Sequence, residues 1–236
     1  MSSGKPRKVL SQIFAIGGGD LAARETFPFD KMVVEATGRV RPWALCIPTA
    51  AQDDPEVCQA FGHVYGDTLR CRTDYLRLFR GEKGGDSFQR KLARNEIFYF
   101  CDGDADKLYD TITQFNLVDG LKAAYDRGAI FCGLGVGAAF LGSAGILPSS
   151  TGLGLTDFQI GCVKEGQCAR EFCDSLRPGQ ADPSCVILEY MTMLNVRQQQ
   201  YRLFSPLPNT KAVTRHANLT ASTEYRSLAE LRSIQA

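Results

Sequence analysis

Short runs of apolar residues recur along the first 140 positions of the chain, and each is followed by glycine or by polar residues. They occupy residues 13–16, 43–47, 97–101 and 129–132. Their length and composition are those of buried parallel strands. Between them, apolar residues return at helical spacing, as at Leu108, Ile112 and Phe115. This alternation predicts an α/β fold, a three-layer sandwich in which helices flank a mostly parallel sheet.

The same patterns predict the remaining elements. We expect helices over residues 29–36, 53–65, 87–95, 166–176 and 224–234. We expect further strands or extended segments over residues 68–76, 185–189, 191–196 and 201–204. Residues 142–154 are rich in Gly, Ser and Pro, which indicates an irregular connection. At 236 residues, the chain is most simply one domain over 1–236, with residues 1–9 as a flexible tail.

Turn-forming residues follow four of the predicted strands. They are residues 17–20, 48–51, 102–104 and 133–137. The carboxyl ends of parallel strands meet at one edge of the sheet, where α/β proteins carry their sites. The last turn, Gly-Leu-Gly-Val-Gly, follows a strand and precedes a small apolar segment, which is the arrangement of a nucleophile elbow. Its centre is Gly135, which has no side chain that could attack a substrate.

Composition narrows the classes of partner. The net charge is +1, and no apolar run approaches 18 residues, so nothing in the sequence argues for nucleic acid or membrane binding. The nine cysteines are odd in number and contain no CxxC pair, which favours reduced thiols and a cytoplasmic location. The one local cluster, Cys162, Cys168 and Cys173, has no histidine near it in sequence. We therefore expect no metal site and no cofactor.

Several short motifs follow one another in the order typical of a known family. They are Ile-Gly-Gly-Gly at 16–19, Ile-Pro-Thr-Ala at 47–50, Asp-Gly-Asp at 102–104 with Leu108, the glycine-rich stretch 128–138, and Gly-Leu-Gly-Leu at 152–155. With these motifs, residues 10–205 resemble the peptidase E and cyanophycinase family of serine peptidases. The resemblance implies the class I glutamine amidotransferase-like fold.

The departures from the family pattern concern its chemistry. The family has its serine nucleophile where this chain has Gly135, and its histidine base where this chain has residues 162–164. The two histidines of the chain, His63 and His216, fall outside that window. A serine is a poor nucleophile without a base, so the two losses together predict a catalytically inactive homologue.

The resemblance also implies a pocket that could still bind a ligand or a protein. Its residues would be Gly18, Gly19, Thr49, Asp102, Gly103, Asp104, Gly135 and Val136. The backbone N–H groups of Val136 and of the 102–104 loop would form an oxyanion hole. Asp102 and Asp104 bring negative charge where the family is mostly neutral, which favours an amine or a cation over an acidic ligand. We expect a small peptide or amino-acid-like ligand and a monomer or homodimer.

Two alternatives remain open. The chain could be an active hydrolase of small acidic peptides with a non-standard nucleophile, for which Cys132 and Ser143 are the candidates and Lys164 the candidate base. Alternatively, Gly135 could replace a serine of the natural protein. Each of these three candidate rescue residues also has a structural interpretation. Cys132 would be a buried strand residue, Ser143 lies eight residues beyond the elbow, and Lys164 would be an exposed lysine.

Overall fold

The computed structural model describes residues 11–79, 86–143, 152–175, 185–197, 200–205 and 212–215. The predicted tail (1–9), the predicted C-terminal helix (224–234) and His216 lie outside these residues. Within the part described, no helix is both long enough and apolar enough to cross a membrane.

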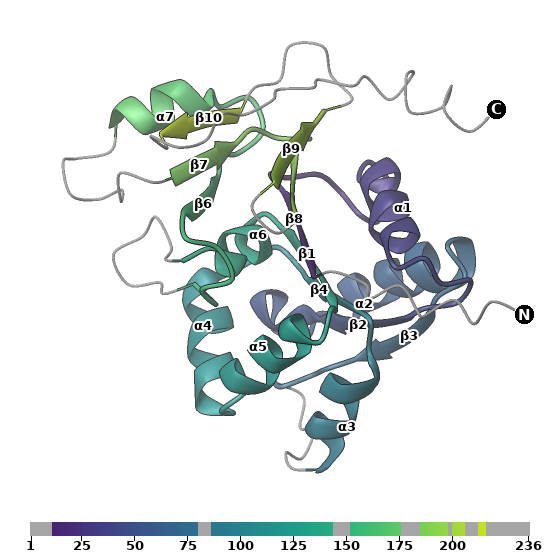
Figure 1. The fold of residues 1–236 in the computed structure, drawn as a ribbon. Coiled ribbons are helices and arrows are strands. Elements are labelled where there is room, and N and C mark those ends of the chain that lie inside the picture. The colour runs from purple at the N-terminus through teal and green to yellow at the C-terminus, as the bar shows by residue number, and fades with distance from the viewer. Residues whose placement is uncertain are drawn as a thin grey trace, which may run out of the picture.

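A seven-stranded sheet forms the centre of the structure (Figure 1). Its strands are β1 (Gln12–Ile16), β2 (Trp43–Ile47), β3 (Arg72–Tyr75), β4 (Ile97–Phe100), β5 (Ile130–Leu134), β8 (Met193–Arg197) and β9 (Gln200–Phe204). They follow the order β3-β2-β4-β5-β1-β8-β9. The first five pair in parallel, whereas β8 and β9 are added antiparallel. The predicted mostly parallel sheet is confirmed.

Helices cover both faces of this sheet, as the apolar strands require. One face carries α1 (Phe27–Ala36), α2 (Pro55–Phe61) and the π-helical turn η2 (Gly62–Thr68). The other carries α4 (Ala105–Gln114), α5 (Val118–Asp126) and α6 (Val136–Leu141), with α3 (Asp86–Arg94) beside α5 (Figure 1). On the first face the rings of Phe61 and Tyr65 pack against Tyr99; on the second, Phe98 stacks on Phe131 with ring centres 4.7 Å apart.

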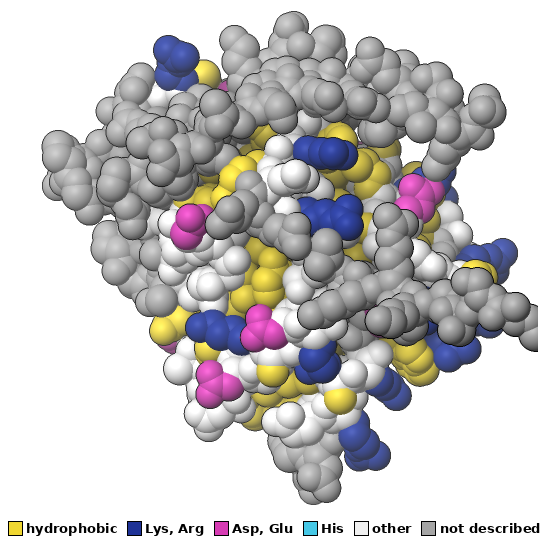
Figure 2. Space-filling model, viewed as in Figure 1, with side chains coloured by type: hydrophobic (Ala, Val, Ile, Leu, Met, Phe, Trp, Pro, Cys, Tyr) yellow, Lys and Arg dark blue, Asp and Glu magenta, His cyan; other side chains and the backbone are white. Residues whose placement is uncertain are grey.

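A second, three-stranded sheet lies beyond the end of α6 (Figure 1). It contains β6 (Gln159–Cys162), β7 (Cys185–Leu188) and β10 (Ala212–Arg215) in the order β10-β7-β6, with α7 (Ala169–Ser175) against it. The sequence patterns predicted β7 but neither β6 nor β10. On the face seen in Figure 2, basic and acidic side chains both occur among polar and apolar ones, in keeping with the small net charge.

The helix predicted over 53–65 differs from the observed one at both ends. The observed helix α2 begins at Pro55 because the Asp54 side chain caps it and accepts the Glu56 N–H at 2.8 Å. The chain then continues without a break into η2 and ends at Thr68, three residues beyond the predicted end. The extended segment predicted over 68–76 is therefore reduced to β3.

Helix α1 carries a buried carboxyl group, that of Asp30. Asp30 is fully buried and accepts hydrogen bonds from the hydroxyls of Thr26 and Tyr65, each at 2.8 Å. Burial raises the pKa of Asp30 to about 7, and the two hydrogen bonds offset only part of that rise. Asp30 is thus held in its neutral form over much of the acid range.

We predict that Asp30→Asn removes a pH dependence of stability. The usual pKa of this carboxyl is 3.8, so between about pH 4 and pH 7 the folded chain binds a proton that the unfolded chain releases. The stability due to the protonated group is complete below pH 4 and falls by about 4 kcal/mol as the pH rises to 7. Asparagine keeps the shape and does not titrate. Urea unfolding from pH 4.5 to 7.5 measures the difference.

Asp104→Asn is the matched control for this experiment, since Asp104 is an exposed helix-capping residue. The control should keep the wild-type pH profile. An Asp30→Asn protein with an unchanged profile would contradict the assignment of the proton to Asp30.

Candidate functional site

The turn at Gly135 has the shape of a nucleophile elbow. β5 ends at Leu134, α6 begins at Val136, and Gly135 between them has φ 54° and ψ −112°. This left-handed backbone disfavours any side chain. Strand and helix approach each other closely here, since a Cβ on Gly133 would lie 2.3 Å from the Gly137 carbonyl oxygen. The predicted strand, turn and helix are all present.

The loop after β4 lies beside this turn. Gly103 has φ 147°, and a Cβ on it would lie 2.3 Å from the Ala50 carbonyl oxygen. The same oxygen accepts the N–H of Asp104 at 2.9 Å. The Asp104 side chain turns to α4 and caps it, accepting the Lys107 N–H at 3.0 Å. Asp104 is therefore accounted for as a helix cap.

The Asp102 side chain, in contrast, reaches across to the elbow. Its Oδ1 accepts the N–H of Val136 at 2.8 Å and the N–H of Gly103 at 2.9 Å. These are the donors that the resemblance assigns to an oxyanion hole, and they do converge on one point. That point is occupied by a carboxylate oxygen of the chain itself, whereas the resemblance implies donors that are open to a ligand.

Asp102 also fills the space of the missing nucleophile. A Cβ added to Gly135 would lie 2.3 Å from Asp102 Oδ1 and 2.4 Å from Asp102 Cγ. Carbon atoms do not approach other heavy atoms so closely without bonding. In the observed arrangement, a side chain at position 135 and the Asp102 carboxylate exclude each other.

The glycine triplet after β1 packs against another loop. A Cβ on Gly17 would lie 2.2 Å from the Glu189 carbonyl oxygen, and one on Gly18 would lie 2.6 Å from the Tyr190 ring. The Tyr190 hydroxyl donates to Glu25 at 2.6 Å. This hydrogen bond is the main reason, and burial the second, why the pKa of Tyr190 is raised to about 12. Gly17 and Gly18 thus allow the close approach of the 189–191 loop.

A cavity of about 390 Å³ opens beside the elbow. Gly19 and Asp102, of the predicted pocket residues, line it, whereas Gly18, Thr49, Gly103, Asp104, Gly135 and Val136 are not among its lining residues. Four side chains in its wall are acidic: Asp20, Asp54, Glu56 and Asp102. No lysine or arginine occurs among the described residues that line it. Of these four carboxylates only Asp102 is among the predicted pocket residues, because only Asp102 lies in a motif of the family pattern.

The three candidate rescue residues lie in a strand, beyond the end of a helix and in a loop. Cys132 is completely buried, and burial raises the pKa of its thiol well above the ordinary value. Ser143 lies beyond the far end of α6, roughly 9 Å along the helix from the elbow. Lys164 is an exposed loop residue whose N–H donates to the Gln167 side chain at 3.0 Å. Cys132 is thus a buried strand residue and Lys164 an exposed lysine, as their structural interpretations state.

Cys162 lies in the segment 162–164, where the family has its histidine, and it is close enough to Asp102 for the carboxylate charge to affect its thiol. Burial and then the Asp102 carboxylate raise the pKa of the Cys162 thiol well above its ordinary value. A protonated thiol is neither an effective nucleophile nor a base. His63 is exposed on η2 and lies 3.0 Å from Asp67. Cys162 was not among the predicted site residues, and only its place in the window pointed to it.

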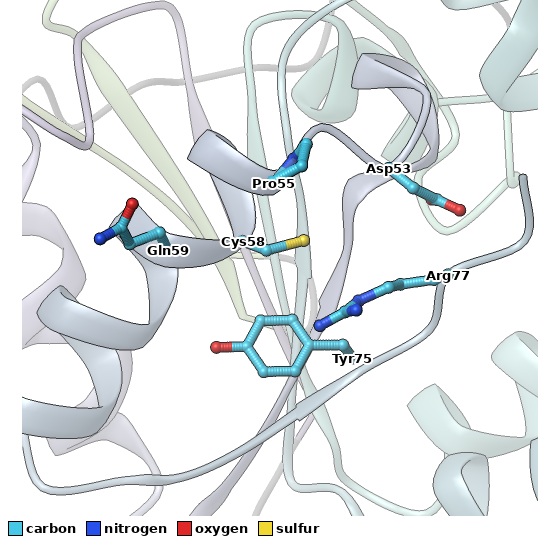
Figure 3. A pocket seen from close by; sticks show the side chains of 6 residues that line it. All are labelled: Asp53, Pro55, Cys58, Gln59, Tyr75 and Arg77. Atoms are coloured by element: carbon cyan, nitrogen blue, oxygen red, sulfur yellow. The ribbon is translucent and has the colours of Figure 1, made fainter. Parts of the chain in front are cut away.

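A second cavity of about 290 Å³ lies where α2 faces the end of β3 (Figure 3). The Arg77 guanidinium lies over the Tyr75 ring, 5.2 Å from its centre, and points towards the Cys58 thiol (Figure 3). Burial raises the pKa of Cys58, and Arg77 offsets part of the rise. Among the residues described, no group of three or more His, Cys, Asp or Glu residues is placed to hold a metal ion.

The contact between Asp102 and position 135 predicts strong coupling between the two. We expect Gly135→Ser to lower the free energy of unfolding by roughly 3 kcal/mol, from strain and from the clash with the carboxylate. In an Asp102→Ala background the same change should cost at least ~1 kcal/mol less, because only the backbone strain remains. Urea unfolding of the four proteins of this double-mutant cycle measures the coupling.

Asp104→Ala provides the control cycle, since that carboxylate belongs to the same loop and caps α4. Gly135→Ser should cost the same with and without it. Equal coupling in the two cycles would show that the clash with Asp102 does not exist in solution.

Comparison with known proteins agrees with this fold. The chain matches the model of peptidase family S51 over residues 13–161. It is 27% identical to the uncharacterized peptidase YgaJ of Bacillus subtilis (strain 168) over 143 residues, which are 60% of this chain and 60% of that protein.

Two solved structures share the fold. The crystal structure of a peptidase from an acI-B1 Actinobacterium has a TM-score of 0.67 at 19% identity, covering 88% of this chain and 95% of its own. A candidate peptidase E protein from Listeria monocytogenes EGD-e has a TM-score of 0.64 at 13% identity, covering 82% and 98%. Because the family match takes in more than half of the chain, including the elbow and the strands around it, the protein belongs to peptidase family S51.

Proposed function

We propose that this member of peptidase family S51 has no peptidase activity and binds a small ligand in the cavity beside the elbow. One observation carries the proposal: the Asp102 carboxylate occupies the space of a nucleophile at position 135 and takes the Val136 and Gly103 N–H donors. A serine peptidase needs the nucleophile, a base for it and free oxyanion donors. The first two have no counterpart among the described residues at the turn, and the third is occupied.

The charge of Asp102 adds a second reason. Attack on a carbonyl carbon places negative charge on the oxygen, and a peptidase stabilises that charge with donors aimed at it. Here the donors already bind an anionic group, so a developing oxyanion would lie against a like charge. The same arrangement that removes the nucleophile therefore opposes the transition state.

The cavity is the feature that remains functional in this proposal. Its volume suits a molecule of the size of a dipeptide or smaller, and family membership makes a small peptide or amino-acid-like ligand the first class to consider. We also propose the cytosol as the compartment, because the cysteines whose side chains are described are free thiols and most are buried.

We predict no hydrolysis of a panel of aspartyl and other dipeptides by the wild-type protein. Gly135→Ser and the double variant Asp102→Ala/Gly135→Ser should also be inactive, because residues 162–164, where the family has its histidine base, contain none. Release of amino acids, followed by mass spectrometry, is the measurement. A fluorophosphonate probe should label none of the three proteins.

Turnover by the wild-type protein would overturn the proposal and support the alternative of a non-standard nucleophile. Cys162→Ala, Cys132→Ala and Ser143→Ala would then identify it. Turnover by the double variant alone would show that Asp102 and Gly135 are the only obstacles to catalysis.

A further inference from the structure

The buried carboxyl group of Asp30 connects two elements on one face of the sheet. Its Oδ2 accepts the hydroxyl of Thr26, the residue that precedes α1, and its Oδ1 accepts the hydroxyl of Tyr65, which lies in η2. A hydroxyl can donate or accept, so both contacts can persist when the carboxyl is protonated. The packing of η2 against α1 therefore depends on the state of one acid group.

No positive charge compensates this carboxyl group within the described part of the chain. The titratable side chains that interact with Asp30 are Tyr65 from η2, Tyr99 from β4 and Cys132 from β5, and all three are completely buried. Burial raises the pKa of each of them well above its ordinary value, so they are neutral near pH 7. Loss of the Asp30 proton thus leaves a negative charge in the core with only neutral groups around it, which is costly.

The π-helical turn η2 is the part of this face that can open at least cost. Only two of its seven residues, Val64 and Tyr65, are buried. It packs on β3, an edge strand of the sheet, where a Cβ on Gly62 would lie 2.9 Å from the Tyr75 hydroxyl. Segments with few buried side chains open more readily than central strands, and π-helical turns are frequent at functional sites. Opening of η2 would remove Tyr65 from Asp30 and admit water to the carboxyl.

We propose that the proton on Asp30 controls a local opening of η2. With the proton in place, η2 stays closed over α1 and the edge of the sheet. Without it, an open state in which water reaches the carboxylate becomes more populated, while the central strands stay folded. This conformational device is independent of ligand binding and of catalysis at the elbow.

Hydrogen exchange followed by mass spectrometry from pH 5 to pH 8 tests the proposal. In the open state Asp30 regains its usual pKa of 3.8, whereas in the closed state its pKa is about 7. The closed state therefore binds the extra proton, and opening becomes easier as the pH rises. After correction for the intrinsic exchange rate, the opening equilibrium of residues 62–68 should rise about fifty-fold from pH 5 to pH 7 and only about twofold from pH 7 to pH 8.

Two variants assign this pH dependence to the buried cluster. Asp30→Asn should abolish it, because asparagine does not titrate. Tyr65→Phe keeps the ring that stacks on Phe61 and removes the hydroxyl that stabilises the charged carboxylate, so the pH at which opening levels off should move upwards. If Asp30→Asn does not fold, an unchanged pH dependence in Tyr65→Phe would by itself overturn the proposal.

The control concerns His63 and Asp67, the other titratable residues of η2, because histidine gains its charge in the same pH range. Their side chains lie 3.0 Å apart and are exposed, so this pair can change the opening equilibrium by at most about fivefold. Asp67→Asn removes the pair and should keep the wild-type pH dependence. A pH dependence that is lost in Asp67→Asn and kept in Asp30→Asn would assign the effect to the wrong group and overturn the proposal.

The exchange of β5 shows whether the opening is local. Residues 130–134 should exchange far more slowly than residues 62–68 at every pH, since the central strand is exposed only by unfolding of the whole sheet. Equal opening of the two segments would overturn the proposal. It would leave the pH dependence of global stability, predicted above for Asp30, unaffected.

Discussion

The hydrogen bonds of the Asp102 carboxylate join the ends of the two central strands, β4 and β5. One donor, Gly103, belongs to the loop after β4, and the other, Val136, begins the helix after β5. Both loops lie at the carboxyl edge of the sheet, where α/β proteins place their sites. A single side chain therefore sets the shape and the charge of the region, and it turns a place suited to anions into one that presents a negative charge.

The scaffold around this contact is maintained by close backbone packing, independently of any chemistry. A Cβ on Gly137 would lie 2.3 Å from the Phe100 carbonyl oxygen, and one on Gly103 equally close to the Ala50 carbonyl oxygen. These approaches require glycine whether or not a nucleophile is present. This explains how an elbow can persist with no side chain at its centre. It also explains why glycine spacing alone could predict the turn but could not predict activity.

The sequence predicted the elements whose signal is local. The apolar runs that became β1, β2, β4 and β5 are short, buried except for Trp43 and bounded by glycine or polar residues, so their length and composition were sufficient to predict them. The three-stranded sheet was not predicted, because β6 contains Gly161 and its pairing with β7 joins segments far apart in sequence. In the site, the turns were predicted, but the Asp102 contact was not. Its orientation depends on the absence of a side chain at Gly135, which no local pattern contains.

That dependence works in both directions. A serine at position 135 needs the space that the Asp102 carboxylate fills, and the carboxylate needs position 135 to be glycine. A serine at position 135 would clash with the carboxylate, and loss of the carboxylate would leave the two N–H donors without their present acceptor, so we expect the two positions to be coupled. The composition in this chain pairs an acid with glycine. Burial is the main cause of the raised pKa of the Cys162 thiol, and the Asp102 carboxylate adds to it by disfavouring the second negative charge that a thiolate would bring.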